Sequence, residues 1–143
     1  MAYEIDKKRS LFKLLKNSLG TKLFRSVYFF VNNKSTDIYQ NGKLSCAFYV
    51  STILKIIGLI ENIHATVEST IKDLEKSGWY KIEKPRKGAI LLWEKRNDHY
   101  HLGFYLEKNK AISNFSSKGV PLVHKLNNNN RKIIAIYFHK DLE

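Results

Sequence analysis

The sequence has a single cysteine, no long apolar run and only 13 acidic residues against 25 basic ones. One cysteine excludes an internal disulfide, and 143 residues are enough to bury a core without one. The apolar run of residues 26–31 is far shorter than the roughly 20 residues that span a bilayer. The N-terminus has no apolar segment of the kind found in signal peptides. We therefore expect one domain over residues 1–143, without a transmembrane segment, that is cytoplasmic or exported without a recognisable signal peptide.

The shortage of acidic residues leaves a net charge of +12. Such a charge favours polyanions, namely nucleic acid, anionic lipid or the anionic polymers of a cell wall. The lysines are scattered through nearly every segment, and no nucleic-acid-binding motif is recognisable. Genome base composition explains the lysine content equally well. An anionic polymer is thus an expected partner of the basic surface, and a nucleic-acid-binding protein remains an alternative.

The first half of the chain has helical periodicity. Apolar residues at helical spacing predict amphipathic helices over residues 10–20 and 21–31, with Ser10 and Thr21 as N-caps. A polar segment then leads to an apolar helix that begins at Cys46 and ends at Gly58. Thr66 is the expected N-cap of a further helix that ends at residues 77–78.

The second half of the chain has the pattern of β-strands separated by turns. A Pro and Gly turn at residues 85–88 precedes the first of them, and residues 127–130 are four asparagines that form a loop. Helices followed by strands predict an α+β fold with a C-terminal antiparallel sheet. The expected strands cover residues 89–93, 99–106, 111–115, 120–126 and 133–138.

Cys46 is placed in the first turn of a buried helix. Unpaired N–H groups and the helix dipole stabilise a thiolate there, so we expect a lowered thiol pKa and a candidate nucleophile. A lone cysteine in an apolar helix is also a common core residue. His101, on a strand, is the candidate general base, and Ser113 and Asn114 lie on the strand expected to pair with it. Gln40 precedes the cysteine and is a candidate oxyanion donor.

Three motifs resemble one family. They are Ser45-Cys46-Ala47-Phe48-Tyr49-Val50, Pro85-Arg86-Lys87-Gly88-Ala89-Ile90-Leu91-Leu92-Trp93 and His101-Leu102-Gly103-Phe104-Tyr105-Leu106. In this order they resemble the NlpC-type papain-like cysteine hydrolases, relatives of the CHAP amidases that cleave amide bonds in bacterial cell-wall peptides. The resemblance implies a papain-like fold in which a nucleophile helix packs on the sheet. The motifs cover roughly residues 40–115, and we expect a catalytic core over residues 40–139 preceded by a helical extension, residues 1–33, that lies outside the resemblance.

The resemblance also implies roles for individual residues. Cys46 corresponds to the nucleophile and His101 to the base. The third position, often a histidine in the family, falls on Ser113, and a shift of one residue brings Asn114, whose carbonyl can orient an imidazole. We predict Asn114, with Ser113 as the alternative, because side chains alternate along a strand and only one of the two can face His101. Gln40 matches the oxyanion glutamine of papain-like proteases, although an exposed loop glutamine explains it equally well.

The sequence departs from the family at Ser45 and Ala89, where acidic residues are usual. His99, His101 and His124 could be imagined as zinc ligands, but no cysteine or carboxylate cluster accompanies them. We expect no metal and no cofactor.

The expected function is a thiol-dependent hydrolase that cleaves an amide bond, with a peptide, above all a cell-wall (peptidoglycan) peptide, as substrate. The same residues would serve acyl transfer. Two alternatives stay open: a catalytically degenerate member of the fold that acts as a binding module, and a basic nucleic-acid-binding protein.

Overall fold

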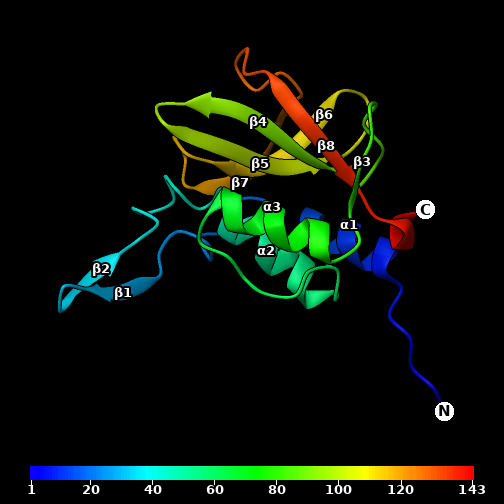
Figure 1. Ribbon diagram of the computed structural model, residues 1–143, viewed down its shortest axis with the longest axis horizontal. Coiled ribbons are helices and arrows are strands. Elements are labelled where there is room, and N and C mark those ends of the chain that lie inside the picture. The colour runs from blue at the N-terminus through cyan, green and yellow to red at the C-terminus, as the bar shows by residue number, and fades with distance from the viewer.

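The computed structural model describes residues 1–143 and consists of three α-helices, a six-stranded sheet and a separate two-stranded sheet. Figure 1 shows the helices gathered on one side of the large sheet. This arrangement confirms the α+β class. The helices are α1 (Lys7–Ser18), α2 (Cys46–Ile56), α3 (Val67–Lys76) and the 3-10 helix η1 (Lys140–Leu142). The strands are β1 (Tyr28–Val31), β2 (Lys34–Asp37), β3 (Tyr80–Lys81), β4 (Ile90–Arg96), β5 (His99–Tyr105), β6 (Lys110–Phe115), β7 (Val120–Lys125) and β8 (Ile133–Phe138).

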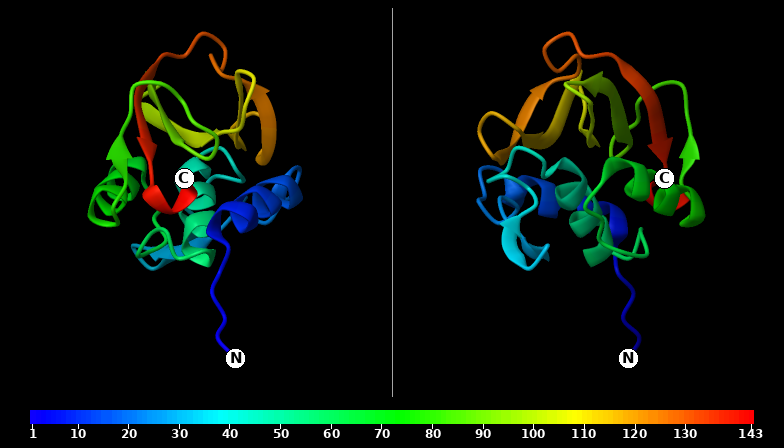
Figure 2. Two further views of the ribbon diagram at one scale, coloured as in Figure 1. Left: turned by 90° about the vertical axis from the view of Figure 1, so that its right-hand side faces the viewer. Right: turned by 60° about the vertical axis from the view of Figure 1, so that its left-hand side comes forward.

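The large sheet is antiparallel throughout, with strand order β3-β8-β4-β5-β6-β7. Strands β4 to β7 follow one another as hairpins, and β8 returns to lie between β3 and β4. The register of β4 shifts against both of its neighbours near Trp93. Such irregularities bend a strand and increase its twist. Accordingly, Figure 2 shows a strongly curved sheet that arches over the helices.

Helix α2 lies at the centre of the core. Ala47, Tyr49 and Val50 are each at most 1% exposed, and the Tyr49 ring meets Phe104 of β5 edge-on at 6.0 Å between centroids. Leu11 and Leu15 of α1 belong to the same hydrophobic cluster. Thus α1 is packed into the core.

The predicted second helix, residues 21–31, is wrong. Residues 28–37 form the β1–β2 hairpin, which projects from the body of the molecule in Figure 1. Asn32 and Asn33 have φ of +50° and +64°, the conformation of a tight two-residue hairpin turn. Tyr-Phe-Phe-Val is a strand-forming sequence. All four side chains of β1 are exposed, so no burial supports a helical pattern there.

The helix ends depend on local capping. Asp6, not the predicted Ser10, caps α1, and its carboxylate accepts a hydrogen bond from the backbone N–H of Arg9 at 3.0 Å. The predicted cap of α3 is confirmed, since Thr66 accepts from the backbone N–H of Ser69. Gly58 follows α2 with φ of +74°, as its glycine predicted. None of the helices combines the length and the apolar character that a membrane span requires.

Candidate active site

Cys46 is the first residue of α2, as the sequence predicted, and Ser45 is its N-cap. The helix starts there because the carbonyl of Ser45 accepts from the backbone N–H of Tyr49 at 2.9 Å. Cys46 is partly exposed and lines a cleft of about 840 Å³ between the N-terminal end of α2, the segment before it and the ends of β4 and β5. His101 and Gln40 line the same cleft. The structure therefore brings three of the predicted site residues to one cavity.

His101 lies on β5 and is 8% exposed. Its Nε2 is 2.8 Å from the hydroxyl oxygen of Ser113 on β6, and its ring rests on Trp93 of β4, with centroids 5.2 Å apart. Ser113 is fully buried, and its hydroxyl also lies 2.7 Å from Nε2 of His124 on β7. Three adjacent strands thus supply a continuous chain of hydrogen bonds that starts at His101.

A glycine makes the His101–Ser113 contact possible. A Cβ atom at Gly103 would lie 2.7 Å from the carbonyl oxygen of Ile112 and 2.8 Å from the Cβ of Ser113. Both distances are far below van der Waals contact, so only glycine lets β6 approach β5 this closely. Residues two apart in a strand share a face, which places His101 beside the space that Gly103 leaves. The spacing of the His-Leu-Gly motif thereby has a steric explanation.

Asn114, the predicted partner of His101, does not contact it. The Asn114 side chain donates from Nδ2 to the carbonyl oxygen of Gly42 at 2.8 Å. The alternation of side chains along β6 turns Ser113 toward His101 and Asn114 to the opposite face. The contact predicted for Asn114 is therefore made by the alternative, Ser113, while Asn114 ties the loop before α2 to the sheet.

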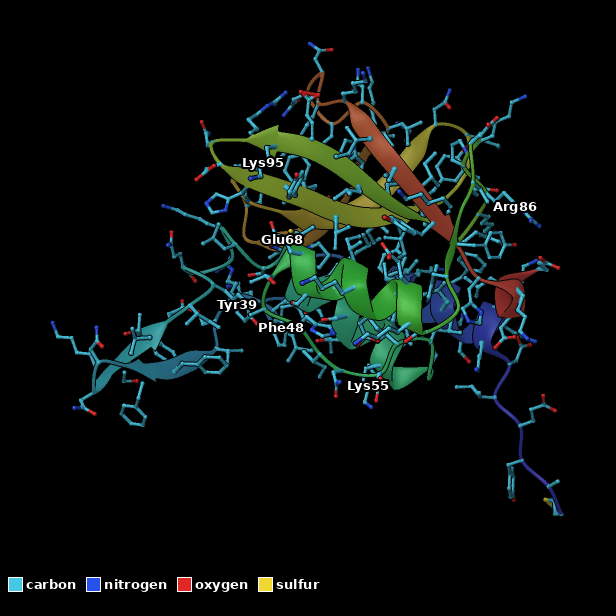
Figure 3. All side chains as sticks on the ribbon, in the orientation of Figure 1. Tyr39, Phe48, Lys55, Glu68, Arg86 and Lys95 are labelled. Carbon is cyan, nitrogen blue, oxygen red and sulfur yellow. The ribbon has the colours of Figure 1, made fainter.

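That loop carries Gln40. The carboxylate of Asp37 accepts from the backbone N–H groups of Tyr39 and Asn41 at 3.1 and 2.8 Å, and Gln40 between them has φ of +50°. The Tyr39 ring stacks on Phe48 of α2 at 4.8 Å between centroids, and Figure 3 shows these two side chains next to each other. Gln40 is exposed at the rim of the cleft, on a loop that packs against α2.

Cys46 and His101 are both uncharged at neutral pH. Burial raises the pKa of the Cys46 thiol, and the backbone amides of Leu102 and Ala47 offset part of that rise. This corrects the expectation of a lowered thiol pKa, because the loss of hydration exceeds the effect of the helix terminus. Burial, together with the positive charge of Arg131, lowers the pKa of His101 to about 3. Cys46 is thus a thiol and His101 an uncharged imidazole.

Arg131 is a residue of the site that sequence reasoning missed. It follows the asparagine loop, and its guanidinium donates to the backbone carbonyls of Glu94, at 2.7 Å, and His99. The positive charge of the guanidinium helps to lower the pKa of His101 and offsets part of the rise in the pKa of Cys46. Nothing in the sequence around Arg131 distinguishes it from the other basic residues.

The contact of His124 with Ser113 was missed as well, and a signal for it was present. Residues 116–119 join β6 to β7, and this loop pairs Ser113 with Leu122. His124 is two residues beyond Leu122, hence on the same face as Ser113. The loop length, which sets hairpin register, could have revealed the pair.

No group of three or more histidine, cysteine, aspartate or glutamate side chains lies close enough together to hold a metal ion. His99, which was weighed as a ligand together with His101 and His124, is exposed. The Nε2 atoms of the other two histidines are both occupied by Ser113.

Comparison with known proteins bears on the fold alone. No protein-family model matches the chain, and no curated protein matches its sequence. Among solved structures, the chain is similar to NlpC2 from Trichomonas vaginalis, with a TM-score of 0.61 and 14% sequence identity. The similarity covers 96% of this chain and 50% of the other, so the chain spans about half the length of that protein. The three helices and the six-stranded antiparallel sheet therefore form an NlpC-like fold.

Proposed function

We propose that the chain is a thiol-dependent hydrolase that cleaves an amide bond in a peptide, with Cys46 as nucleophile and His101 as general base. One observation carries the proposal: a buried imidazole, held by the Ser113 hydroxyl at 2.8 Å, opens onto the same cleft as a cysteine at a helix N-terminus. A nucleophile, a base and a group that orients the base are the minimum that covalent catalysis needs.

The proposed reaction starts from uncharged groups. As the Cys46 sulfur attacks the amide carbonyl, the thiol proton moves to the ring nitrogen of His101 that does not bond Ser113. The carbonyl oxygen becomes an oxyanion, which the backbone N–H of Cys46 and the side-chain amide of Gln40 stabilise. The C–N bond then breaks, and His101 gives its proton to the departing amine. Water, deprotonated by His101, attacks the thioester, releases the acid and restores the thiol.

The lining of the cleft favours an anionic substrate. Lys43, Arg96 and Arg131 line it, whereas Glu68 is the one acidic residue that does. In a cleft, side chains with charges of one sign raise the local concentration of ligands with the opposite charge. We therefore propose a peptide with a carboxylate near the scissile bond, and a cell-wall peptide is the natural member of that class for an NlpC-like fold. The catalytic domain in this proposal is the whole chain, residues 1–143, since α1 contributes to the core.

The first test is alkylation of Cys46 by iodoacetamide in the native protein, in His101→Gln and in the control His99→Gln. His99 lines the same cleft but is exposed. Because a general base contributes roughly a hundredfold or more, we expect His101→Gln to slow alkylation at neutral pH at least tenfold and His99→Gln to leave it nearly unchanged. The rate should rise with pH through a thiol pKa above the ordinary value, as burial dictates.

Activity is then measured by mass spectrometry of cell-wall peptides incubated with the native protein and with Cys46→Ala. We expect hydrolysed amides only with the native protein. If Cys46 reacts only after unfolding and no peptide is cleaved, the proposal fails.

The same cleft supports a second candidate, a binding module for anionic peptides, because its cationic lining does not depend on Cys46. Binding of the same peptides that is equal in the native protein and Cys46→Ala, without cleavage by either, would favour it.

A further inference from the structure

His124 is the one member of the hydrogen-bond chain to which the proposed reaction gives no part. Its Nε2 lies 2.7 Å from the Ser113 hydroxyl and its Nδ1 lies 2.8 Å from the backbone carbonyl oxygen of Lys125. The ring packs between Trp93 and Phe115, with centroids 5.7 and 5.3 Å away. Both ring nitrogens therefore have partners, and two aromatic side chains fix the plane of the ring.

The direction of each hydrogen bond follows from the bond between His124 and the backbone carbonyl of Lys125. A backbone carbonyl oxygen only accepts, so Nδ1 of His124 carries a hydrogen. In a neutral imidazole the other nitrogen is then an acceptor, and Nε2 of His124 accepts from the Ser113 hydroxyl. That hydroxyl has one hydrogen, which is now used. Toward His101 the Ser113 oxygen can only accept, so Nε2 of His101 must donate.

These hydrogen-bond directions determine which nitrogen of His101, the proposed base, carries the hydrogen. A neutral His101 with its hydrogen on Nε2 has a lone pair on Nδ1, and burial keeps this ring neutral with a pKa of about 3. Nδ1 is the nitrogen that remains for the Cys46 proton. Without an acceptor behind it, the Ser113 hydroxyl could instead donate to His101 and stabilise the tautomer with the hydrogen on Nδ1. That tautomer has no lone pair to offer Cys46.

We infer that His124 is a positioning residue that acts through Ser113 and fixes His101 in the tautomer with a free Nδ1. The inference rests on the proposed function for its purpose, though its structural content concerns His101, Ser113 and His124 alone. Ser113 contacts the proposed base directly, and the imidazole of His124 contacts Ser113 from the next strand.

The direct test is the protonation pattern of the His101 ring, read by heteronuclear NMR of nitrogen-labelled protein. In the native protein we expect hydrogen on Nε2 and none on Nδ1. His124→Phe keeps an aromatic ring between Trp93 and Phe115 but removes the acceptor, so we expect a mixture of the two tautomers. His124→Gln offers a carbonyl oxygen to the Ser113 hydroxyl and should restore the native pattern. A native pattern in His124→Phe would overturn the inference.

The alkylation rate of Cys46 supplies the second readout. We expect His124→Phe to slow alkylation at neutral pH by about threefold to tenfold, a small part of the roughly hundredfold or more that a general base contributes, and His124→Gln to recover most of the loss. Ser113→Ala and Ser113→Ala/His124→Phe should be equally slow, because His124 acts only through the hydroxyl. An additive double variant contradicts that route.

The two proposals fail separately. If His124→Phe changes the His101 tautomer while Cys46 stays inert, the positioning role stands and the hydrolase proposal falls. If the alkylation rate of Cys46 depends on His101 but the His101 tautomer is the same in the native protein and His124→Phe, the hydrolase proposal stands and the positioning role of His124 falls.

Discussion

Two clusters in this chain combine serine and histidine, and they differ in how charge is compensated. The His101 cluster (His101, Ser113 and His124) contains no carboxylate. The Asp73 cluster (Ser51, His64, Asp73 and Ser77) is centred on one. Nε2 of His64 lies 2.6 Å from the Asp73 carboxylate, and the Ser77 hydroxyl donates to the same group at 2.8 Å.

The partners of Asp73 explain what its cluster does. The carboxylate also accepts from the backbone N–H groups of Glu61 and Asn62, and the Ser51 hydroxyl accepts from the backbone N–H of His64. These contacts fasten the connection between α2 and α3. Hydrogen bonds from His64 and Ser77, together with the two amides, lower the pKa of Asp73 to about 2 despite burial. The Asp73 cluster is a structural clamp with a compensated charge.

The His101 cluster has the opposite character. Burial of its imidazole is not balanced by an acid, so the pKa of His101 falls to about 3 and the ring stays neutral. In this chain the histidine that faces a carboxylate, His64, holds a connection between two helices, whereas His101, which has no carboxylate partner, lines the cleft that contains Cys46.

The largest expected effect is a difference in how acid changes the stability contributed by each of the two clusters. The pKa of His101 is about 3 in the native protein, below its ordinary value of 6.5. Between these two values the imidazole is protonated in the unfolded chain but not in the native protein, so the free energy of unfolding decreases as pH falls. From about pH 6.5 to 4 we expect the native protein to lose about 1.4 kcal/mol per pH unit more than His101→Gln, measured by urea unfolding. Parallel curves would show that His101 is not held neutral.

The Asp73 clamp contributes in a lower window. Its depressed pKa means that its stabilisation is complete above the ordinary value of 3.8 and is lost as pH falls toward 2. His101→Gln should therefore still lose stability below about pH 4. Because the two pH windows overlap little, the difference between the native protein and His101→Gln above about pH 4 reports on His101 and not on Asp73.

Gly103 tests the steric basis of the His101 cluster. In Gly103→Ala the new methyl group would meet the Ile112 carbonyl and the Ser113 Cβ, so β5 and β6 must separate. We expect a loss of about 3 kcal/mol, the upper part of the range for overpacking, and an alkylation rate of Cys46 close to that of Ser113→Ala. Gly20→Ala is the control, since a Cβ there meets nothing within 4 Å although its φ is +73°. It should leave alkylation unchanged. A stable Gly103→Ala with native alkylation would contradict the steric explanation.

The sequence predicted the parts of the site that depend on local patterns. Cys46 at a helix start and His101 on a strand followed from periodicity and from a helix that ends at Gly58. The choice between Asn114 and Ser113 did not, because the face each presents is set by pairing with β5. The structure decides the choice, because the Cβ of Ser113 lies only 2.8 Å from where a Cβ at Gly103 would be, and residues two apart in a strand put Gly103 on the same face as His101.

The β1–β2 hairpin was mistaken for a helix for a different reason. Apolar residues recur over 21–31 at a spacing that a helix would bury, but Tyr28 and Phe30 are 65% and 82% exposed. A periodic pattern predicts a helix only when a core covers one face. The Asn32-Asn33 pair was the stronger sequence signal, since asparagine tolerates the positive φ that both residues have in the hairpin turn. Likewise, the contact between His64 and Asp73 spans a connection without periodicity, so no pattern could have revealed it.

Asp73→Asn gives the smallest of these effects and completes the comparison. The neutral amide keeps one acceptor oxygen but loses the other, so at least one of the four donors around it is left without its partner. We expect a loss of about 2 kcal/mol in the free energy of unfolding, together with loss of the acid sensitivity near pH 2 to 4 that is assigned to the clamp. Alkylation of Cys46 at neutral pH should be unchanged, because the Asp73 cluster has no atom in the hydrogen-bond chain of His101. Slower alkylation in Asp73→Asn would mean that the Asp73 cluster also positions the N-terminal end of α2. His64 would then influence the candidate active site, and the two clusters would not be independent.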